Sequence, residues 1–142
     1  SAEDEHIAIS SASRFGVEKW LHRKGSELSG GELQRVLLAR AVAQKTSVLL
    51  CDEPASSLDP KHLWATFRHL RELAHTDGVA TLVSVHDLSL AASLCDRIVV
   101  LSDGHVHYDG LAGQLDEDLL SHAFGTTVHK IQTHDGSFFT YT

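Results

Sequence analysis

The 142-residue sequence has no methionine, only two prolines and two cysteines, and few aromatic residues. Cys51 and Cys95 each lie in an apolar segment, without a CxxC pair or dense cysteine spacing. This pattern argues against a disulfide framework and against a cysteine-based zinc site. We therefore expect both thiols to be reduced and buried.

Long apolar runs and an excess of positive charge are also missing. No run approaches the roughly 18 to 20 apolar residues of a membrane-spanning helix, and residues 1–5 are acidic where a signal peptide would be basic. The formal net charge of -7 gives no basic field for nucleic acid or anionic lipid. We expect no nucleic-acid binding, no direct membrane insertion and a cytoplasmic chain that reaches a membrane through a protein partner.

Histidine is abundant, with 11 residues, so metal binding has to be considered. His105 and His107 lie two apart in a strand-like stretch, which places both rings on one face. His129 and His134 are the candidates to join them. No carboxylate or cysteine completes a set at a recognised spacing, so the pattern does not favour a specific histidine metal site.

The length and the 42% hydrophobic content predict one domain with a buried core. Helix-like and strand-like segments alternate from the middle of the chain onward, which predicts an α/β fold. Weak helical patterning covers residues 3–14 and 17–22. Apolar residues at helical spacing predict an amphipathic helix over 30–44. Its expected apolar positions are Leu33, Val36, Leu37 and Ala41.

A strand, a helix and a second strand form the expected centre of the fold. Residues 48–51 are apolar without alternation, as in a strand buried on both faces of a parallel sheet. Asp59 and Pro60 supply an N-cap and a first-turn proline for a helix that should run to about Thr76. A second buried strand is expected over residues 80–85.

The remaining residues are expected to form helices and two hairpins. Helices are predicted over 88–94 and 118–124. Turn residues at Asp103-Gly104 and at His134-Asp135-Gly136 predict the two hairpins. Their expected strands are 97–101 with 105–108, and 128–132 with 137–141.

The segment Leu28-Ser29-Gly30-Gly31-Glu32 places a serine and two glycines at the start of a predicted helix. Unpaired backbone N–H groups and the helix dipole favour an anion there, so a phosphate would fit. Taken alone, a Ser-Gly-Gly helix start is also a common N-cap. Both interpretations stay open at this point.

Two adjacent acids follow the first predicted strand. Asp52 and Glu53 lie at its carboxyl end, where α/β folds bind ligands. Because side chains alternate along a strand, one acid could hold a hydrated Mg²⁺ while the other polarises an attacking water. His86 follows the second strand, where an imidazole could contact a terminal phosphate. Taken alone, the acids also fit a solvated loop or helix cap, and the histidine an ordinary polar residue.

The order of these features resembles that of ABC ATPase subunits. Residues 28–34 with Arg35 resemble the signature motif of that family, and residues 48–53 resemble its Walker B strand and catalytic glutamate. Ser57-Leu58-Asp59 resembles its D-loop, and His86 its switch histidine. The resemblance implies a P-loop NTPase-type parallel sheet flanked by helices, with ATP and Mg²⁺ as cofactors.

The resemblance also implies where the nucleotide binds. Ser29, Gly30 and Gly31, with Glu32 in the same segment, would reach the γ-phosphate of ATP held on the opposite subunit of a head-to-tail dimer. Asp59 would communicate across the dimer interface.

The hydrolytic roles fall on three other residues. By the resemblance, Asp52 would hold the Mg²⁺ shell, Glu53 would be the general base for the attacking water, and His86 would contact the γ-phosphate. Such chemistry consists mostly of positioning and charge stabilisation.

One part of the family pattern is absent from the sequence. GxxxxGK[ST], whose backbone cradles the phosphates, is missing, and so is the glutamine loop expected before the signature motif. We therefore expect the C-terminal part of an ATPase subunit, nearly inactive alone and with exposed apolar sheet edges. The expected divisions are a helical-subdomain remnant (1–28), a core ATPase segment (29–110) and a C-terminal helix and hairpin (111–142).

The tail indicates a class of cargo. Residues 114–128 and the final hairpin resemble ATPase subunits of iron-chelate, haem and cobalamin importers, with phosphonate or amino-acid uptake as alternatives. The implied partners are a second ATPase subunit and membrane permease subunits, with the chain on the cytoplasmic face of the inner or plasma membrane. A different function stays open: a non-catalytic interaction module that donates its signature segment to another ATPase subunit.

Overall fold

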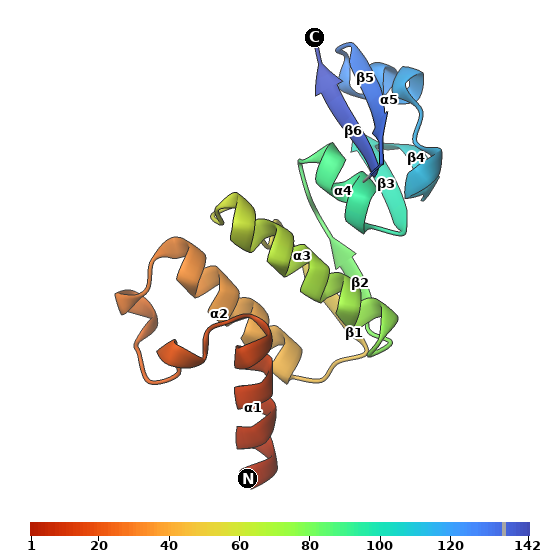
Figure 1. Ribbon diagram of the computed structural model, residues 1–142. Helices are drawn as coiled ribbons and strands as arrows, with labels where there is room; N and C mark the ends of the chain where they lie inside the picture. The colour runs from red at the N-terminus through yellow and green to blue at the C-terminus, as the bar shows by residue number, and fades with distance from the viewer. Residues whose placement is uncertain (135) are drawn as a thin grey trace. The chain divides into compact units, whose positions relative to one another are not determined.

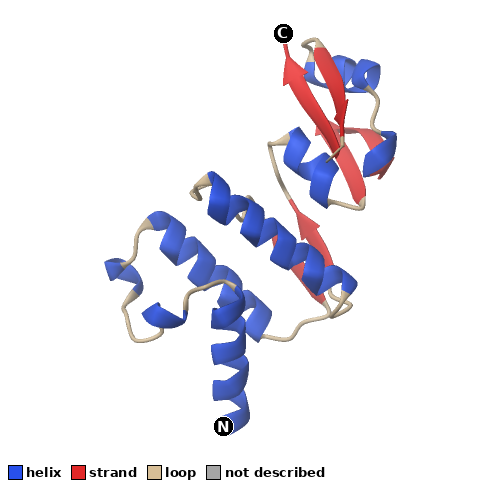
Figure 2. Cartoon of the chain, in the orientation of Figure 1, coloured by secondary structure: helices blue, strands red, loops and turns tan. Residues whose placement is uncertain are grey.

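The computed structural model describes residues 1–134 and 136–142, which form two compact units, Ser1–Ser84 and Val85–Thr142 (Figure 1). Helices make up most of the first unit, and paired strands make up much of the second (Figure 2). Helices and strands are thus mixed, as the sequence predicts. The boundary between the units falls inside the expected core segment 29–110, and the three-part division of the chain stays a prediction.

The first unit begins with two helices that lie side by side (Figure 1). Helix α1 (Ala2–Arg14) starts with a capping box in which the Ser1 side chain accepts from the Asp4 backbone N–H. Two 3-10 turns, η1 (Glu18–Trp20) and η2 (Gly25–Glu27), lead to helix α2 (Gly30–Ala43). The predicted helices over 3–14 and 30–44 are confirmed, whereas of the predicted segment 17–22 only Glu18–Trp20 is helical, as a 3-10 turn.

One detail of the predicted α2 surface is wrong. Leu37, expected on the apolar face, is 50% exposed, whereas Leu38 and Ala39 are 6% and 5% exposed. Consecutive helical residues are rotated by about 100°, so a stripe through Leu38 turns Leu37 toward the outside. The local pattern did not distinguish the two because both neighbouring positions are leucine.

A parallel strand pair with its connecting helix follows α2. Strand β1 (Val48–Cys51) pairs with β2 (Ala80–Val83) in the register Val48↔Ala80, and α3 (Pro60–His75) connects them. The Asp59 side chain caps α3 by accepting from the His62 backbone N–H at 3.0 Å. This strand-helix-strand unit is the one the sequence predicts.

The expectation that these strands are buried on both faces is wrong for the structure described. Side chains alternate across β1, so that Leu49 is 6% exposed and Leu50 is 71% exposed. On β2, Leu82 is likewise 65% exposed. One face of the pair packs on the helices, and no described residue covers the other, although its side chains are apolar.

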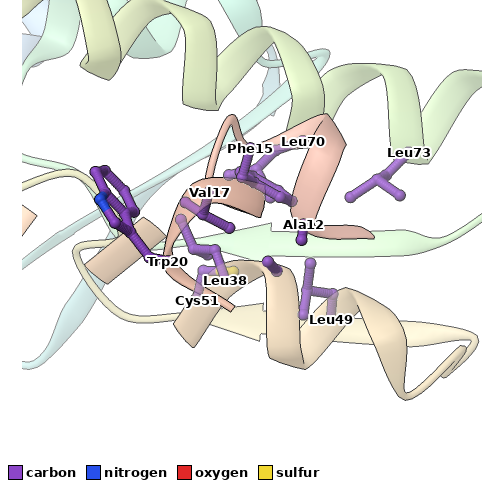
Figure 3. Packing of buried hydrophobic residues seen from close by; sticks show 10 residues of the cluster. Ala12, Phe15, Val17, Trp20, Leu38, Leu49, Cys51, Leu70 and Leu73 are labelled. Atoms are coloured by element: carbon purple, nitrogen blue, oxygen red, sulfur yellow. The ribbon is translucent and has the colours of Figure 1, made fainter. Parts of the chain in front are cut away.

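The core of the first unit lies between α1, α2, α3 and the covered face of β1 (Figure 3). Phe15 and Val17, just after α1, meet Leu38 of α2 and Leu70 of α3 in this cluster. Burial raises the pKa of the Cys51 thiol, which belongs to the same core. Cys51 is therefore buried as expected, while Cys95 in the second unit is only partly buried.

The second unit consists of two antiparallel hairpins and two helices. The turn of the first hairpin contains Asp103 and Gly104 at φ of 49° and 75°, and both predicted hairpins are confirmed. Asp135, in the second predicted turn, lies outside the described residues. Leu115, Leu120 and Val128 form the centre of this unit's core. The elements are α4 (Leu88–Leu94), β3 (Arg97–Ser102), β4 (His105–Leu111), η3 (Ala112–Gln114), α5 (Glu117–Phe124), β5 (Val128–Thr133) and β6 (Gly136–Tyr141).

The histidines are not gathered into a metal-binding group in the part of the chain that the structure describes. Two of them, His107 and His122, make a T-shaped ring contact with centroids 6.0 Å apart. No set of three or more histidine, cysteine, aspartate or glutamate side chains suited to a metal occurs among the described residues. None of the described helices is long and apolar enough to span a membrane.

Candidate functional site

The start of α2 carries the expected anion-binding segment. Ser29 is the N-cap: its Oγ accepts from the Glu32 backbone N–H at 3.4 Å, and Glu32 Oε2 accepts from the Ser29 N–H at 2.8 Å. The backbone hydrogen bond from Ser29 lowers the pKa of Glu32. Glu32 therefore acts as a capping residue, and the donors left for an anion at this helix start are the backbone N–H groups of Gly30 and Gly31 and the hydroxyl of Ser29.

The two glycines differ in how closely they approach the loop after β1. A Cβ added to Gly31 would lie 2.9 Å from the backbone oxygen of Ser57, whereas one added to Gly30 would have Ser57 Cβ at 3.9 Å as its nearest neighbour. The start of α2 therefore packs closely against Ser57 and Leu58 of the same chain. A side chain at position 31 would force that loop to move.

The carboxyl end of β1 presents the two predicted acids. Asp52 Oδ1 accepts from the Ser84 hydroxyl at 2.5 Å, and the Glu53 backbone N–H donates to the Ser84 Oγ at 2.9 Å. Ser84 directly follows β2, so the parallel pairing of the two strands brings its hydroxyl to both acids. Sequence analysis did not identify Ser84 as a site residue.

The backbone of Glu53 has an unusual conformation. Its φ is 44°, in the left-handed region that a non-glycine residue rarely occupies. Such conformations persist when the surroundings hold them, and they concentrate at functional sites. The Glu53 carbonyl accepts a hydrogen bond from the side chain of Gln34 at 2.8 Å, which links α2 to this strand end.

Asp59 lies at the other end of the same loop. Its carboxylate accepts from the backbone N–H of His62 at 3.0 Å and lies 2.8 Å from the Nδ1 of His62. The backbone hydrogen bond from His62, followed by the bond to its ring, lowers the pKa of Asp59. Its observed contacts are those of a helix cap, and the expected communication across a dimer stays a prediction.

His86 is the predicted site residue that belongs to the second unit. It is exposed, in the segment after β2 and next to Asp87, whose side chain caps α4 by accepting from the Leu90 N–H at 2.9 Å. The structure thus brings Ser29 through Glu32, Asp52, Glu53 and Asp59 onto one unit. The expected contact of His86 with a phosphate stays a prediction.

The available atoms suit the predicted cofactors in part. Asp52 is exposed, and its Oδ2 makes no hydrogen bond to a described residue, which leaves a hard oxygen donor of the kind Mg²⁺ prefers. The glycine N–H groups at the start of α2 suit a phosphate oxygen. The Glu32 carboxylate adds negative charge at this helix start and so weakens its attraction for phosphate.

The chain is similar in sequence to known ABC transporter proteins. Residues 3–56 match the family model described as ABC transporter. The phosphonates import ATP-binding protein PhnC of Escherichia coli (strain K12) is 38% identical over 132 residues, which cover 93% of this chain and 50% of PhnC. PhnC of Shigella boydii serotype 4 (strain Sb227) is 38% identical over 92% of this chain and 49% of its own length. The chain is homologous to ABC transporter ATPase domains.

Solved structures confirm the α/β fold of this ABC ATPase homologue. The ATP-binding cassette MJ0796, solved as a dimer bound to ADP and Pi, superposes with a TM-score of 0.73 at 31% identity over 81% of this chain and 50% of its own chain. A metal-chelate type ABC transporter in an inward-facing conformation has a TM-score of 0.84 at 21% identity over 100% of this chain and 57% of its own. The chain thus spans about half the length of the curated relatives it matches.

Proposed function

We propose that this chain supplies hydrolytic residues to an ABC ATPase that drives import across a membrane. The observation that carries the proposal is the carboxyl end of β1, where Asp52 and Glu53 are adjacent and share the Ser84 hydroxyl. A Gly-Gly helix start packs against the same loop. Phosphoryl transfer needs such an arrangement of metal ligand, base and backbone donors.

Each residue has a definite task in this proposal. Asp52 holds the Mg²⁺ shell through its exposed carboxylate, and Glu53 takes the proton of the attacking water. Ser29, Gly30 and Gly31 donate to the γ-phosphate of ATP bound on the opposite subunit. When bound, Mg²⁺ neutralises charge on the phosphates. The remaining proposed roles are a γ-phosphate contact by His86, a dimer contact by Asp59 and a capping role for Glu32 beside the nucleotide.

The proposed partners are a second ATPase subunit in a head-to-tail dimer and membrane permease subunits. MJ0796, solved as a dimer, supports the first partner, and PhnC, named as an import ATP-binding protein, supports the second. The permease would hold the chain peripherally at the cytoplasmic face of the membrane. The chain itself contains no GxxxxGK[ST], so we propose that its residues act only where that loop is also present.

The cargo is proposed only as a class. The PhnC relatives at 38% identity favour a phosphonate, an alternative that the sequence alone already allowed. The iron-chelate, haem or cobalamin prediction from the tail gains no support from these relatives. Contacts to the cargo belong to other subunits, so the cargo class has to be tested in cells. Deleting the coding sequence and measuring growth on a phosphonate as the single phosphorus source, or on an iron chelate as the single iron source, would separate the two classes of cargo.

The experiment that tests the proposal is Mg-ATP turnover by the ATPase assembly that carries this sequence. We expect Glu53→Gln to abolish turnover and to leave ATP binding intact, because the amide keeps the shape of the side chain and loses the base. Glu5→Gln, the same change at an exposed position of α1, should turn over ATP like the wild type. Unchanged turnover in Glu53→Gln would instead support a non-catalytic interaction module.

A further inference from the structure

A second side chain, besides that of Ser84, makes a hydrogen bond to the backbone of Glu53. The Gln34 Nε2 donates to the Glu53 carbonyl at 2.8 Å and lies 3.4 Å from the Ser56 Oγ. The Gln34 Oε1 accepts from the Ser57 backbone N–H at 3.2 Å. A carbonyl only accepts and an amide N–H only donates, so these partners fix which end of the Gln34 amide faces each of them.

The position of Gln34 gives these bonds a consequence beyond local packing. Gln34 lies on α2, three residues after Gly31, so it moves with the helix start that carries the proposed phosphate donors. Its partners are the backbone of the proposed base and the first residue of the D-loop segment, Ser57. A shift of α2 is therefore transmitted to both through one side chain.

The conformation of Glu53 makes it sensitive to such a link. A φ of 44° is unfavourable for a non-glycine residue, so the hydrogen bonds of its two peptide groups help to hold this backbone conformation and the position of the side chain that it carries. Ser84 restrains the N–H side and Gln34 restrains the carbonyl side. Loss of either restraint lets the Glu53 backbone shift, and the Cα that carries the carboxylate shifts with it.

We propose that Gln34 is a positioning residue that couples the signature helix α2 to the orientation of the Glu53 carboxylate and to the Ser57 loop. The inference rests on the proposed ATPase function. Gln34 does not touch the reacting atoms; it acts through Glu53. A misplaced catalytic group lowers the rate of the chemical step more than the binding of substrate, so the coupling should be visible in kcat rather than in KM.

The test compares Gln34→Met with Gln34→Glu and with a matched control. Methionine keeps the length of the side chain and removes both hydrogen-bonding ends, whereas glutamate keeps an acceptor for the Ser57 N–H and loses the donor to the Glu53 carbonyl. Gln44→Met makes the same change at the end of α2, where the exposed Gln44 side chain makes no hydrogen bond to a described residue.

Two measurements are made on each variant. Mg-ATP turnover of the ATPase assembly gives kcat and KM, and the amide resonance and exchange rate of Ser57 in the chain report the loop. We expect Gln34→Met to lower kcat by about 10- to 100-fold with KM for ATP changed by less than about 2-fold. Ser57 exchange should be faster in Gln34→Met and close to wild type in Gln34→Glu, while Gln34→Glu turns over ATP as slowly as Gln34→Met.

The outcomes separate this inference from the proposed function. Turnover that is absent in the wild type or insensitive to Glu53→Gln overturns the proposed function, and the inference with it. If Glu53→Gln abolishes turnover but Gln34→Met and Gln34→Glu have the kcat of Gln44→Met, only the coupling is overturned. The coupling is also overturned if Gln34→Glu folds and its KM rises by the same factor as its kcat falls. A rise in KM of that size indicates that ATP binding is lost, rather than that the base is misplaced.

Discussion

The hydroxyl of Ser84 donates a hydrogen bond to Asp52 Oδ1 at 2.5 Å. The Oγ of Ser84 also accepts a hydrogen bond from the Glu53 backbone N–H, so this one side chain binds both adjacent acids. The Oδ1 atom is thereby oriented from within the chain, and Oδ2 is left for another ligand. Mutation of a residue that orients a metal ligand in this way typically lowers metal affinity by about 10- to 100-fold.

The first prediction replaces Ser84 by threonine or by valine, two side chains of nearly equal shape. Threonine keeps the hydroxyl, whereas valine leaves the Asp52 carboxylate and the Glu53 N–H without this partner. We expect Ser84→Val to lower the free energy of unfolding by about 1 kcal/mol relative to Ser84→Thr, measured by urea denaturation.

Turnover should separate the same two variants. Ser84→Val should need about tenfold more Mg²⁺ for half-maximal ATP turnover than Ser84→Thr, because the Asp52 ligand is less well oriented. Equal Mg²⁺ dependence of the two variants would contradict a role for the Ser84 hydroxyl in orienting Asp52.

The second prediction uses the two neighbouring glycines of α2. In Gly31→Ala the new Cβ meets the Ser57 backbone oxygen at 2.9 Å, so the loop or the helix must shift, and we expect a loss of stability of about 1–3 kcal/mol. Gly30→Ala has ordinary contact at 3.9 Å and gains helix propensity, so its stability should be unchanged or higher. Thermal unfolding measures both, and equal melting temperatures would show that the approach at Gly31 is not tight.

Local sequence signals predicted most elements, because the groups that begin and end these helices and turns are neighbours in the chain. Asp59-Pro60 starts α3 as expected, and Ser29 forms the predicted cap of α2. The Asp103-Gly104 turn likewise connects β3 and β4. Cap and turn residues act on backbone groups a few residues away, so their pattern can be read from sequence alone.

Long-range relationships were not predictable in this way. The Gln34 to Glu53 bond joins residues 19 apart, and the Ser84 to Asp52 bond joins residues 32 apart. Gln34 lies in the segment 28–34 that resembles the signature motif, but nothing in the local pattern indicates its partners, and nothing marks Ser84 at all. The alternating exposure of β1 was also missed, because an apolar strand has the same composition whether or not a second layer covers it.

The third prediction concerns acid stability and Asp59. Its pKa is lowered from the ordinary value of 3.8 by the hydrogen bonds from His62, so the charged form is favoured in the folded state. This contribution is fully present above the ordinary value and is lost as the pH falls through the lowered pKa. In Asp59→Asn the cap remains and the titrating charge is gone.

The measurement is the melting temperature of both proteins between pH 6 and pH 2. The melting temperature of the wild type should fall relative to that of Asp59→Asn only below about pH 4. In that range the carboxyl of the unfolded chain binds protons more readily than that of the folded chain. A difference between the two proteins that stays constant down to pH 2 would mean that the Asp59 charge contributes nothing that titrates.

The last prediction compares adjacent leucines on opposite faces of β1. Leu49 is 6% exposed and packs in the core with Leu38 and Leu73, so Leu49→Ala should destabilise the chain by about 2–5 kcal/mol. Leu50 is 71% exposed on the uncovered face, so Leu50→Ala should change stability by no more than about 0.5 kcal/mol. Urea denaturation of the 142-residue chain measures both, and a large cost for Leu50→Ala would show that this face is covered in solution, as the sequence pattern of a doubly buried strand predicts.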